Sequence, residues 1–361
     1  MAAAGDQYQA RRERGLMGSS TRLQVDYLTL PEPGSAQWDG VLGVVAFEDL
    51  PESLDETDVP VAEINTPLLG AKAPVFEIWH TQRPVESGQR ARVRYRRDES
   101  VLFGCISVPE IAATALAGES PRSALQAATE QAYREIFSVL DSVGYSHLLR
   151  VWNYLPEINA DRYGSERYWQ FNQARRDTLV ACGRAVSGAV PAACALGSTL
   201  GSPLVIYFLA SKSAPEAVEN PRQTSAFQYP PKYGPRPVFA RASVLRDASA
   251  NLLFISGTAS IVGHETFHIG DAAAQTRESL VNIEALLGEA NRVAGAARFA
   301  LGSLAYKVYV RHSSDLPVIQ AQLSAAVGDC ARIVYLRADI CRQDLLVEIE
   351  AAGLDLDPAG S

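Results

Sequence analysis

The sequence predicts an α+β protein of two related domains, each a mixed sheet with two helices packed on one face. The 361 residues are enough for two domains, and a loop rich in proline and tyrosine at 218–237 separates two halves. In each half, strand-like runs precede a helix, a strand and a second helix, as expected for one sheet covered by two helices. The expected domains are 21–230 and 231–353, with a disordered tail at 1–20 and another tail at 354–361.

The elements of the first half follow from apolar runs bounded by proline, glycine and acidic residues. A helix is expected over 121–143, because Pro121 suits a first turn, apolar residues recur at helical spacing, and Gly144 ends the pattern. A second helix is expected over 165–182. The expected strands are 41–48, 73–80, 101–109, 148–155 and 203–211.

The second half shows the same pattern more clearly. A helix is expected over 271–291, with Asp271 as its N-cap and a buried apolar stripe. Another is expected over 316–327, with Asp315 as its N-cap. The expected strands are 237–245, 251–260, 304–312, 331–340 and 345–351.

Composition and charge exclude several kinds of partner. A net charge of −8 argues against nucleic acid or an anionic membrane surface, and no apolar run is long enough to span a bilayer. The N-terminus lacks the apolar core of a secretory signal, and the five cysteines form no CxxC pair, so we expect a cytoplasmic protein. No motif suggests a metal site, and no cofactor is expected.

The segment LLVEIE at 345–350 places glutamates in an apolar strand. Alternation puts Glu348 and Glu350 on one face and Val347 and Ile349 on the other. A buried Glu348 would stay protonated near neutral pH, because burial disfavours the anion, and would then suit a reaction that needs a proton donor. Alternatively, both glutamates lie on a solvated face of a half-exposed strand.

The second half resembles the Rid/YjgF family over nearly its whole length. The resemblance is carried, in the family's order, by YGPRPVFARA, LLFISGTASI, GDAAAQTRESLVNIEALLGEA, YKVYVRHSSDLPVIQA and DLLVEIEA. The arginine with which Rid deaminases bind a carboxylate would fall near Arg332. The spacing from Arg332 to Glu348 is one residue longer than in Rid proteins, which reverses a strand side chain, so that role is not carried over.

Two further segments, RVWNYLPEIN at 150–159 and the loop at 218–237, have no place in Rid proteins and resemble the chorismatases. This resemblance covers about residues 25–353. It implies two Rid-like domains, the first degenerate and the second carrying the catalytic glutamate. It also implies chorismate as the small-molecule substrate, cleaved to pyruvate and a cyclic acid. The chain would act as a monomer or a homotrimer.

Two positions indicate the product. The chorismatase branch that forms 3-hydroxybenzoate has glycine and cysteine where this chain has Gly257 and Cys341, whereas the hydrolytic branch has alanine at both. The resemblance therefore implies 3-hydroxybenzoate, with 4-hydroxybenzoate also open. Gly257 would leave room beside the ring, or would alternatively be a β-bulge glycine. Cys341 would assist the final proton transfer, or would alternatively be a small buried apolar residue.

The resemblance and residue chemistry together suggest a set of site residues. Arginines suit the two carboxylates of chorismate because a planar guanidinium matches a carboxylate, and tyrosines supply hydroxyls and an apolar wall. The expected catalytic residues are Glu348 and Cys341. The expected substrate-binding residues are Arg150, Asn153, Tyr229, Tyr233, Arg236, Arg241, Gly257 and Ala259. Alternatively, the arginines form surface ion pairs, the tyrosines pack between the domains, and Asn153 caps a turn.

The expected mechanism begins with Glu348 protonating the methylene of the enolpyruvyl ether. As the resemblance implies, the C4 hydroxyl then displaces the pyruvyl group, and the epoxide opens to 3-hydroxybenzoate. Three alternatives remain: a chorismate hydrolase that yields a dihydroxycyclohexadiene acid, a Rid-like enamine or imine deaminase, and a small-molecule binding protein without catalysis.

Overall fold

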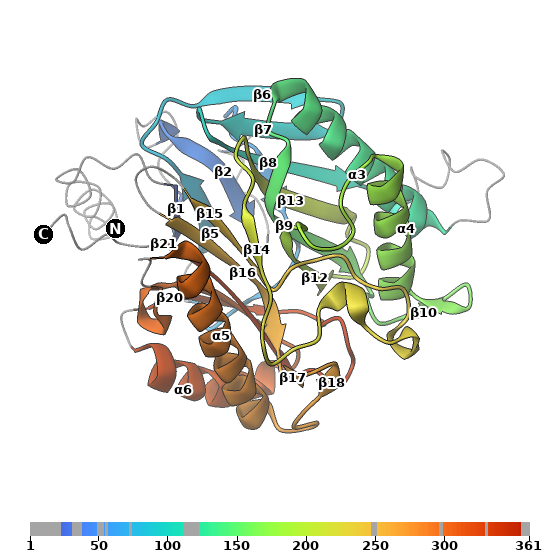
Figure 1. Cartoon of the computed structure of the whole chain (residues 1–361), viewed down its shortest axis with the longest axis vertical. Coiled ribbons are helices and arrows are strands. Elements are labelled where there is room, and N and C mark those ends of the chain that lie inside the picture. Colours follow the sequence, from blue (N-terminus) through green and yellow to red (C-terminus); the bar gives the residue numbers. More distant parts are fainter. Residues whose placement is uncertain are drawn as a thin grey trace, which may run out of the picture.

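The structure is a computed structural model that describes residues 23–30, 38–48, 54, 57–71, 74–110, 123–246, 251–295, 299–328 and 331–354. Within these ranges, three sheets of four or more strands, two two-stranded hairpins and four α-helices form the fold (Figure 1). The expected tails at 1–20 and 354–361 lie outside the described residues, except for Leu354, which ends the last strand. Pro121, expected at the start of a helix, also lies outside them.

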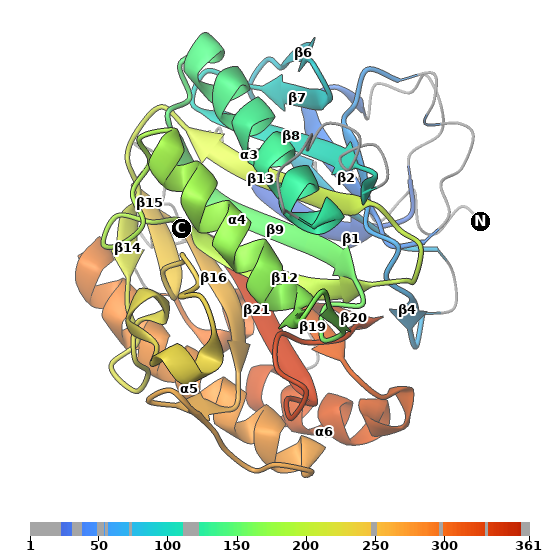
Figure 2. The ribbon, with the colours of Figure 1, turned by 90° about the vertical axis from the view of Figure 1, so that its right-hand side faces the viewer.

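The middle of the chain forms a six-stranded sheet in the order β12-β9-β13-β8-β7-β6. Its strands are β6 (Glu86–Arg90), β7 (Val93–Arg97), β8 (Val101–Val108), β9 (His147–Pro156), β12 (Ala192–Ser198) and β13 (Leu204–Ser211). Strand β12 pairs parallel to β9, and the other pairs are antiparallel, so the sheet is mixed. Helices α3 (Ala124–Val143) and α4 (Arg167–Ala181) run together across one face (Figure 2).

The C-terminal part forms a seven-stranded sheet in the order β14-β15-β16-β21-β19-β20-β4. Its strands are β4 (Leu68–Leu69), β14 (Glu216–Val218), β15 (Ala242–Arg246), β16 (Asn251–Ala259), β19 (Ala305–Val310), β20 (Arg332–Arg337) and β21 (Val347–Leu354). Helices α5 (Ala272–Ala294) and α6 (Leu316–Val327) pack on one face of it (Figure 1). Asp271 caps α5 by accepting from the Ala274 amide, whereas Asp315 precedes α6 without a capping hydrogen bond.

A third sheet has four strands in the order β1-β5-β2-β3. Its strands are β1 (Gln24–Leu28), β2 (Val41–Ala46), β3 (Val61–Glu63) and β5 (Phe76–His80). The remaining elements are the hairpins β10 (Asp161–Arg162) with β11 (Ser165–Glu166) and β17 (Ile261–Val262) with β18 (Glu265–Thr266), and the 3-10 turns η3 (Ala226–Gln228), η4 (Pro231–Tyr233), η5 (Leu301–Ser303) and η6 (Ser313–Asp315).

The three sheets share one central core. Trp79 of the four-stranded sheet packs against Trp152 of the six-stranded sheet and Phe254 of the seven-stranded sheet, with ring centroids 5.7 and 6.2 Å apart. Trp152 in turn stacks on Tyr207 at 4.4 Å. Each of the two large sheets also packs against its own pair of helices through one further apolar cluster. The faces of the large sheets away from the helices are therefore buried too, and a polar side chain on them must find a buried partner.

The α+β class is confirmed, with two helices on each of two mixed sheets. The separate four-stranded sheet and strands β6, β7 and β12 were not expected from the sequence. Strands β6 and β7 read ESGQR and VRYRR, which lack a run of apolar residues, and β12 is made of small residues. Strand β14 lies before residue 231 and yet joins the seven-stranded sheet, so the division at 230 stays a prediction.

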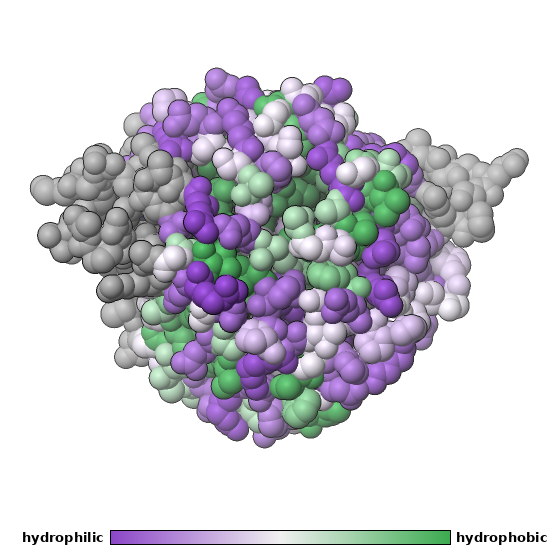
Figure 3. All heavy atoms as spheres, viewed as in Figure 1, coloured by the Kyte–Doolittle hydropathy of each residue, from purple (hydrophilic) through white to green (hydrophobic). Residues whose placement is uncertain are grey.

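The outer surface is mixed in character. On the face shown in Figure 3, polar and charged residues are interspersed with small clusters of apolar residues. Within the described part of the chain, no helix combines the length and apolar character needed to cross a membrane.

Candidate active site

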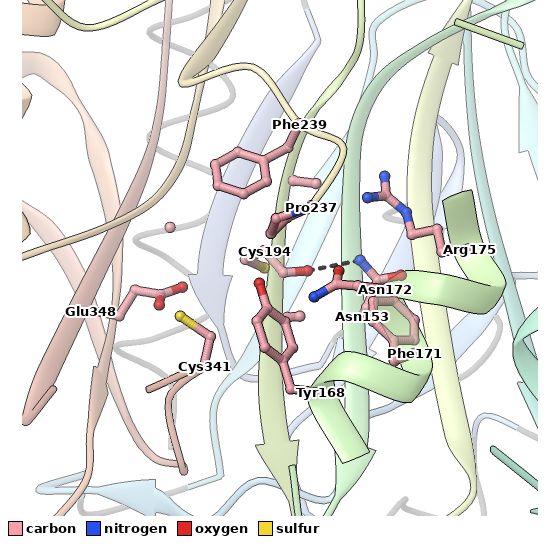
Figure 4. A pocket seen from close by; sticks show the side chains of 13 residues that line it. Asn153, Tyr168, Phe171, Asn172, Arg175, Cys194, Pro237, Phe239, Cys341 and Glu348 are labelled. Carbon is pink, nitrogen blue, oxygen red and sulfur yellow. Dashed lines mark hydrogen bonds between the residues drawn. The ribbon is translucent and has the colours of Figure 1, made fainter. Parts of the chain in front are cut away.

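A pocket that is partly open to solvent lies between the two large sheets. Glu348, Cys341 and Gly257 come from the seven-stranded side, and helix α4 and strand β12 form the opposite wall (Figure 4). Pro237 and Phe239, from the segment before β15, close a third side. The lining residues are Asn153, Tyr168, Phe171, Asn172, Arg175, Ala193, Cys194, Ala195, Pro237, Phe239, Gly257, Cys341 and Glu348.

Glu348 is a buried carboxyl group facing this pocket. It lies on β21, opposite Ala259 of β16 and Tyr309 of β19, and only 4% of it is exposed. Burial and the neighbouring Glu350 raise the pKa of Glu348 to about 8, although arginines nearby oppose the shift. The carboxyl group is therefore mostly protonated at neutral pH, which is the state a general acid requires. The alternative of a solvated strand face is wrong, because both faces of β21 are buried.

Glu350, two residues along the same face, is held in the opposite protonation state. Burial by itself would raise its pKa, but Lys307 and Arg150 outweigh that effect and hold the pKa of Glu350 below its usual range. Arg150 donates to its carboxylate at 2.5 Å and Trp152 donates at 2.7 Å. The strand thus presents one carboxyl group that keeps its proton and one that is ionised.

The ionised Glu350 belongs to a buried network that connects all three sheets. Lys307 lies 3.1 Å from Glu350 and 2.5 Å from Glu77 of β5. Tyr207 and Trp79 also donate to Glu77, at 3.1 and 2.7 Å. Two carboxylates and two cations balance in charge, and removal of one would leave an uncompensated charge in the core.

We expect Glu350→Gln to move the pH dependence of catalysis. Without the anion at 350, the pKa of Glu348 falls, so the alkaline limb of activity, expected near pH 8 in the natural protein, shifts to lower pH. Stability falls by about 3 kcal/mol, because Arg150 loses its carboxylate partner and Lys307 keeps only Glu77. The pH profile of turnover and denaturant unfolding measure the two effects, with the exposed Glu284→Gln as a control. An unchanged alkaline limb would contradict this role of Glu350.

Gly257 makes room for the Glu348 carboxyl group. It lies at an irregularity of β16, where the pairing with β21 shifts between Ile255 and Thr258. A Cβ atom at position 257 would lie 1.8 Å from Glu348 Oε1 and 2.6 Å from its carboxyl carbon. The irregular pairing fits the expected bulge glycine, and the Glu348 carboxyl group occupies the space beside it. The expected room for the substrate ring stays a prediction. An alanine at 257 requires the carboxyl group to move.

Cys341 lies in the pocket on the turn between β20 and β21. Burial and the neighbouring Glu348 raise the pKa of its thiol to about 12. The thiol is therefore neutral, and any role in catalysis is that of a neutral, weakly donating group rather than a nucleophilic thiolate.

Four residues of α4 line the pocket and were not expected from the sequence: Tyr168, Phe171, Asn172 and Arg175. Arg175 is 3% exposed; its Nε donates to the Tyr133 hydroxyl and its Nη1 to the Val238 carbonyl, both at 2.6 Å. Among the described residues, its Nη2 has no partner and no carboxylate neutralises its charge. The amide nitrogen of Asn172 is also buried without a hydrogen bond, although the side chain lies near the Tyr168 hydroxyl.

Of the expected arginines, Arg150 is the one the structure places least favourably for a substrate. Its guanidinium is 1% exposed and bound to Glu350 and to the Val151 carbonyl. Its expected role as a carboxylate ligand does not fit this placement, because its charge is already neutralised in the core. Arg236 is exposed and does not line the pocket.

Arg241 does not line the pocket either, but it lies near enough to Glu348 to act on its pKa. It is 4% exposed, and its Nη2 donates to the Tyr229 hydroxyl at 2.9 Å and to the Thr224 carbonyl at 2.6 Å. Its Nε is buried without a partner in the described part of the chain, and its charge acts on Glu348. Tyr229 and Tyr233 pack together with ring centroids 5.7 Å apart, and Arg342 lies 4.1 Å from the centre of the Tyr233 ring.

Asn153 lines the pocket but acts mainly as a support. Its amide nitrogen donates to the Cys194 carbonyl of β12 at 2.7 Å, and its oxygen accepts from Tyr133 at 2.7 Å. Tyr133 also accepts a hydrogen bond from Arg175 Nε. Asn153 therefore links β12, through Tyr133, to the Arg175 guanidinium. Ala259 is buried opposite Glu348 in the strand pairing and does not line the pocket. The roles of these residues stay predictions.

A protonated glutamic acid across a pocket from guanidinium and amide groups is an arrangement that acid catalysis on an anionic small molecule would require. Comparison with known proteins agrees with this class. The family described as "Chorismatase FkbO/Hyg5-like, N-terminal" matches residues 77–210. The chain belongs to the chorismatase family, an enzyme family, and the resemblance expected from the sequence is confirmed.

Relatives cover most of the chain. A protein named 3-hydroxybenzoate synthase from Streptomyces hygroscopicus is 38% identical over 322 residues, 86% of this chain and 90% of its own. A chorismatase from Streptomyces rapamycinicus is 38% identical over 283 residues, 76% of this chain and 80% of its own. A crystal structure of a chorismatase superposes with a TM-score of 0.79 at 33% identity and covers 93% of this chain and 99% of that one.

Proposed function

We propose that this protein converts chorismate into 3-hydroxybenzoate and pyruvate. The observation that carries the proposal is the buried Glu348, protonated at neutral pH and aimed into a pocket that Gly257 and Cys341 also line. A relative at 38% identity is named 3-hydroxybenzoate synthase, which supports the same product. The cytoplasm is the proposed location.

The proposed reaction begins with proton transfer from Glu348 to the methylene carbon of the enolpyruvyl ether. The resulting oxocarbenium ion weakens the ether bond at ring C3. The C4 hydroxyl then attacks C3, its proton returns to the Glu348 carboxylate or to solvent, and pyruvate leaves with the ether oxygen. The C4–O bond of the epoxide then breaks, the oxygen stays on C3 and takes up a proton from Glu348 or solvent, and C3 loses its hydrogen as a proton, which gives 3-hydroxybenzoate. The sequence consumes no water, so a pocket that holds the ring against Gly257 and limits water favours it over hydrolysis.

One carboxylate of chorismate, in this proposal, binds to Arg175 and Asn172. Both residues line the pocket on the α4 side, across from Glu348 (Figure 4). Each has a buried side-chain nitrogen without a partner in the described part of the chain, and an unneutralised buried guanidinium is costly unless an anion joins it. Arg241 remains the candidate for the other carboxylate because its charge acts on Glu348.

We expect Arg175→Lys to raise the KM for chorismate by about tenfold or more, equivalent to about 1.4 kcal/mol of binding. Lysine keeps the positive charge but loses the planar set of donors that reaches Tyr133, Val238 and the pocket together. Steady-state kinetics measures this effect, with Arg176→Lys, the neighbouring and more exposed arginine, as the matched control. An unchanged KM would show that the carboxylate is bound elsewhere.

The proposed function is tested by pyruvate release from chorismate with the purified protein. A parallel incubation with a small enamine tests the Rid-like alternative. Pyruvate from chorismate without enamine hydrolysis supports the proposal, whereas enamine hydrolysis alone would replace it with deaminase chemistry. Because one chain supplies both walls of the pocket, we also propose that a monomer is active, rather than only a trimer, which size-exclusion chromatography of the active protein tests.

A further inference from the structure

The turn that carries Cys341 is held by one arginine. Arg311 follows β19 and lies beneath the segment 339–346, which connects β20 to β21. Its side chain is 9% exposed. We propose that Arg311 is a positioning residue that fixes Cys341 in the pocket and so controls which product forms, an inference that rests on the proposed function.

Every N–H of the Arg311 guanidinium is used on this turn or on its neighbour Asn159. Three donors bind backbone carbonyls, those of Leu345 at 2.7 Å, Ile340 at 3.0 Å and Arg342 at 2.8 Å. The other two, both on Nη1, bind Asn159 Oδ1 at 3.2 Å and Asp339 Oδ1 at 2.8 Å. With five donors occupied, Arg311 has none left for a substrate carboxylate.

Arg311 binds the backbone on both sides of Cys341. The carbonyls of the residues before and after it, Ile340 and Arg342, both accept from the same Nη2 atom. Asn159 adds a second support, because its amide nitrogen donates to the Ile340 carbonyl at 3.0 Å. A lysine has three donors on one flexible nitrogen and does not reproduce this fork.

Other contacts than those of Arg311 and Asn159 hold Glu348 in place. Its strand pairs with β16 and β19, and the Leu346 amide just before it donates to Gln275 Oε1 of α5 at 2.7 Å. Loosening the turn at 340–342 therefore displaces Cys341 more than it displaces Glu348. Proton transfer and product choice, which depend on these two residues, become separable.

The position of Cys341 sets how easily water reaches the oxocarbenium ion. A neutral Cys341 thiol beside Glu348 fills part of the pocket next to the reacting ether. When the turn loosens, the thiol withdraws and water gains access to the oxocarbenium ion. Water then completes hydrolysis, adding one H2O to chorismate to give pyruvate and the dihydroxycyclohexadiene acid, in competition with attack by the C4 hydroxyl.

The test compares Arg311→Lys and Asn159→Ala with the natural protein in two measurements. The first is the ratio of dihydroxycyclohexadiene acid to 3-hydroxybenzoate, which we expect to rise in both variants while pyruvate release falls less. The second is alkylation of Cys341 by iodoacetamide, followed by mass spectrometry of the tryptic peptide 338–342, which needs no substrate. We expect about tenfold faster alkylation in Arg311→Lys, equivalent to about 1.4 kcal/mol less stabilisation of the closed turn.

Arg246→Lys is the matched control, because Arg246 is an exposed arginine at the end of β15 that pairs with Glu216, away from the turn. Asn159→Ala removes one support and keeps Arg311, so the test survives a folding defect in Arg311→Lys. Unchanged alkylation and unchanged product ratio in both variants would overturn the proposal. If the natural protein makes no 3-hydroxybenzoate, the proposed function fails, and the alkylation rates still decide whether Arg311 positions Cys341.

Discussion

Glu348→Gln is expected to lower pyruvate release from chorismate by a hundredfold or more, on the order found when a general acid is removed. Glutamine keeps the shape of the side chain but has no proton to transfer to the methylene carbon. Chorismate binding is expected to survive, because the donors assigned to its carboxylates are other side chains, of which Asn172 and Arg175 line the pocket. Turnover and ligand titration are measured side by side, and Glu284→Gln, an exposed glutamate of α5, serves as the control.

The same variant is expected to gain stability at alkaline pH. In the unfolded chain Glu348 has a pKa of 4.5, and in the folded protein about 8, so the unfolded state loses its proton first as pH rises. The natural protein therefore loses stability between these values, on the order of 4–5 kcal/mol at 1.36 kcal/mol per pKa unit. Glutamine does not titrate, so the difference in stability between Glu348→Gln and the natural protein should grow from pH 4.5 to 8.

If Glu348→Gln keeps a turnover close to that of the natural protein, Glu348 is not the general acid.

The double variant Gly257→Ala with Cys341→Ala is expected to change the product. An alanine Cβ at 257 takes the space of the Glu348 carboxyl group, 1.8 Å from Oε1, so the carboxyl group must adopt another position. The smaller side chain at 341 opens room for water. We expect pyruvate release to fall by about ten- to a hundredfold but stay measurable, and the product to shift toward the dihydroxycyclohexadiene acid.

Cys341→Ala alone is expected to give a mixture of both products, because Glu348 keeps its position. Chromatography of the acids measures the ratio. Gly288→Ala is the matched control, since a Cβ at that glycine of α5 meets nothing within 4 Å. A double variant that makes only 3-hydroxybenzoate would show that positions 257 and 341 do not set the product.

Sequence patterns predicted that Glu348 is buried and protonated, but not what surrounds it. The alternation of LLVEIE put Glu348 and Glu350 on one face, but their different protonation states depend on Arg150, 200 residues away in the chain. Such a pairing arises only when the two large sheets face each other. Likewise, the closeness of Gly257 to Glu348 follows from an irregular pairing of β16 with β21 that no local pattern specifies.

The polar pocket residues of α4 were missed for a different reason. Asn172 and Arg175 lie on the buried face of α4, where sequence reasoning expects apolar residues, and polar residues on a helix usually indicate a solvated face. Their buried nitrogens without partners, in the described part of the chain, are the reason we propose them as ligands of a substrate carboxylate.

The most direct measurement is a product analysis of the natural protein incubated with chorismate, with pyruvate and the ring-derived acids quantified by chromatography and mass spectrometry. We predict one pyruvate for each 3-hydroxybenzoate, formed below pH 8 and lost as pH rises through the pKa of Glu348. Intact chorismate, or the dihydroxycyclohexadiene acid as the sole ring product, would contradict the account.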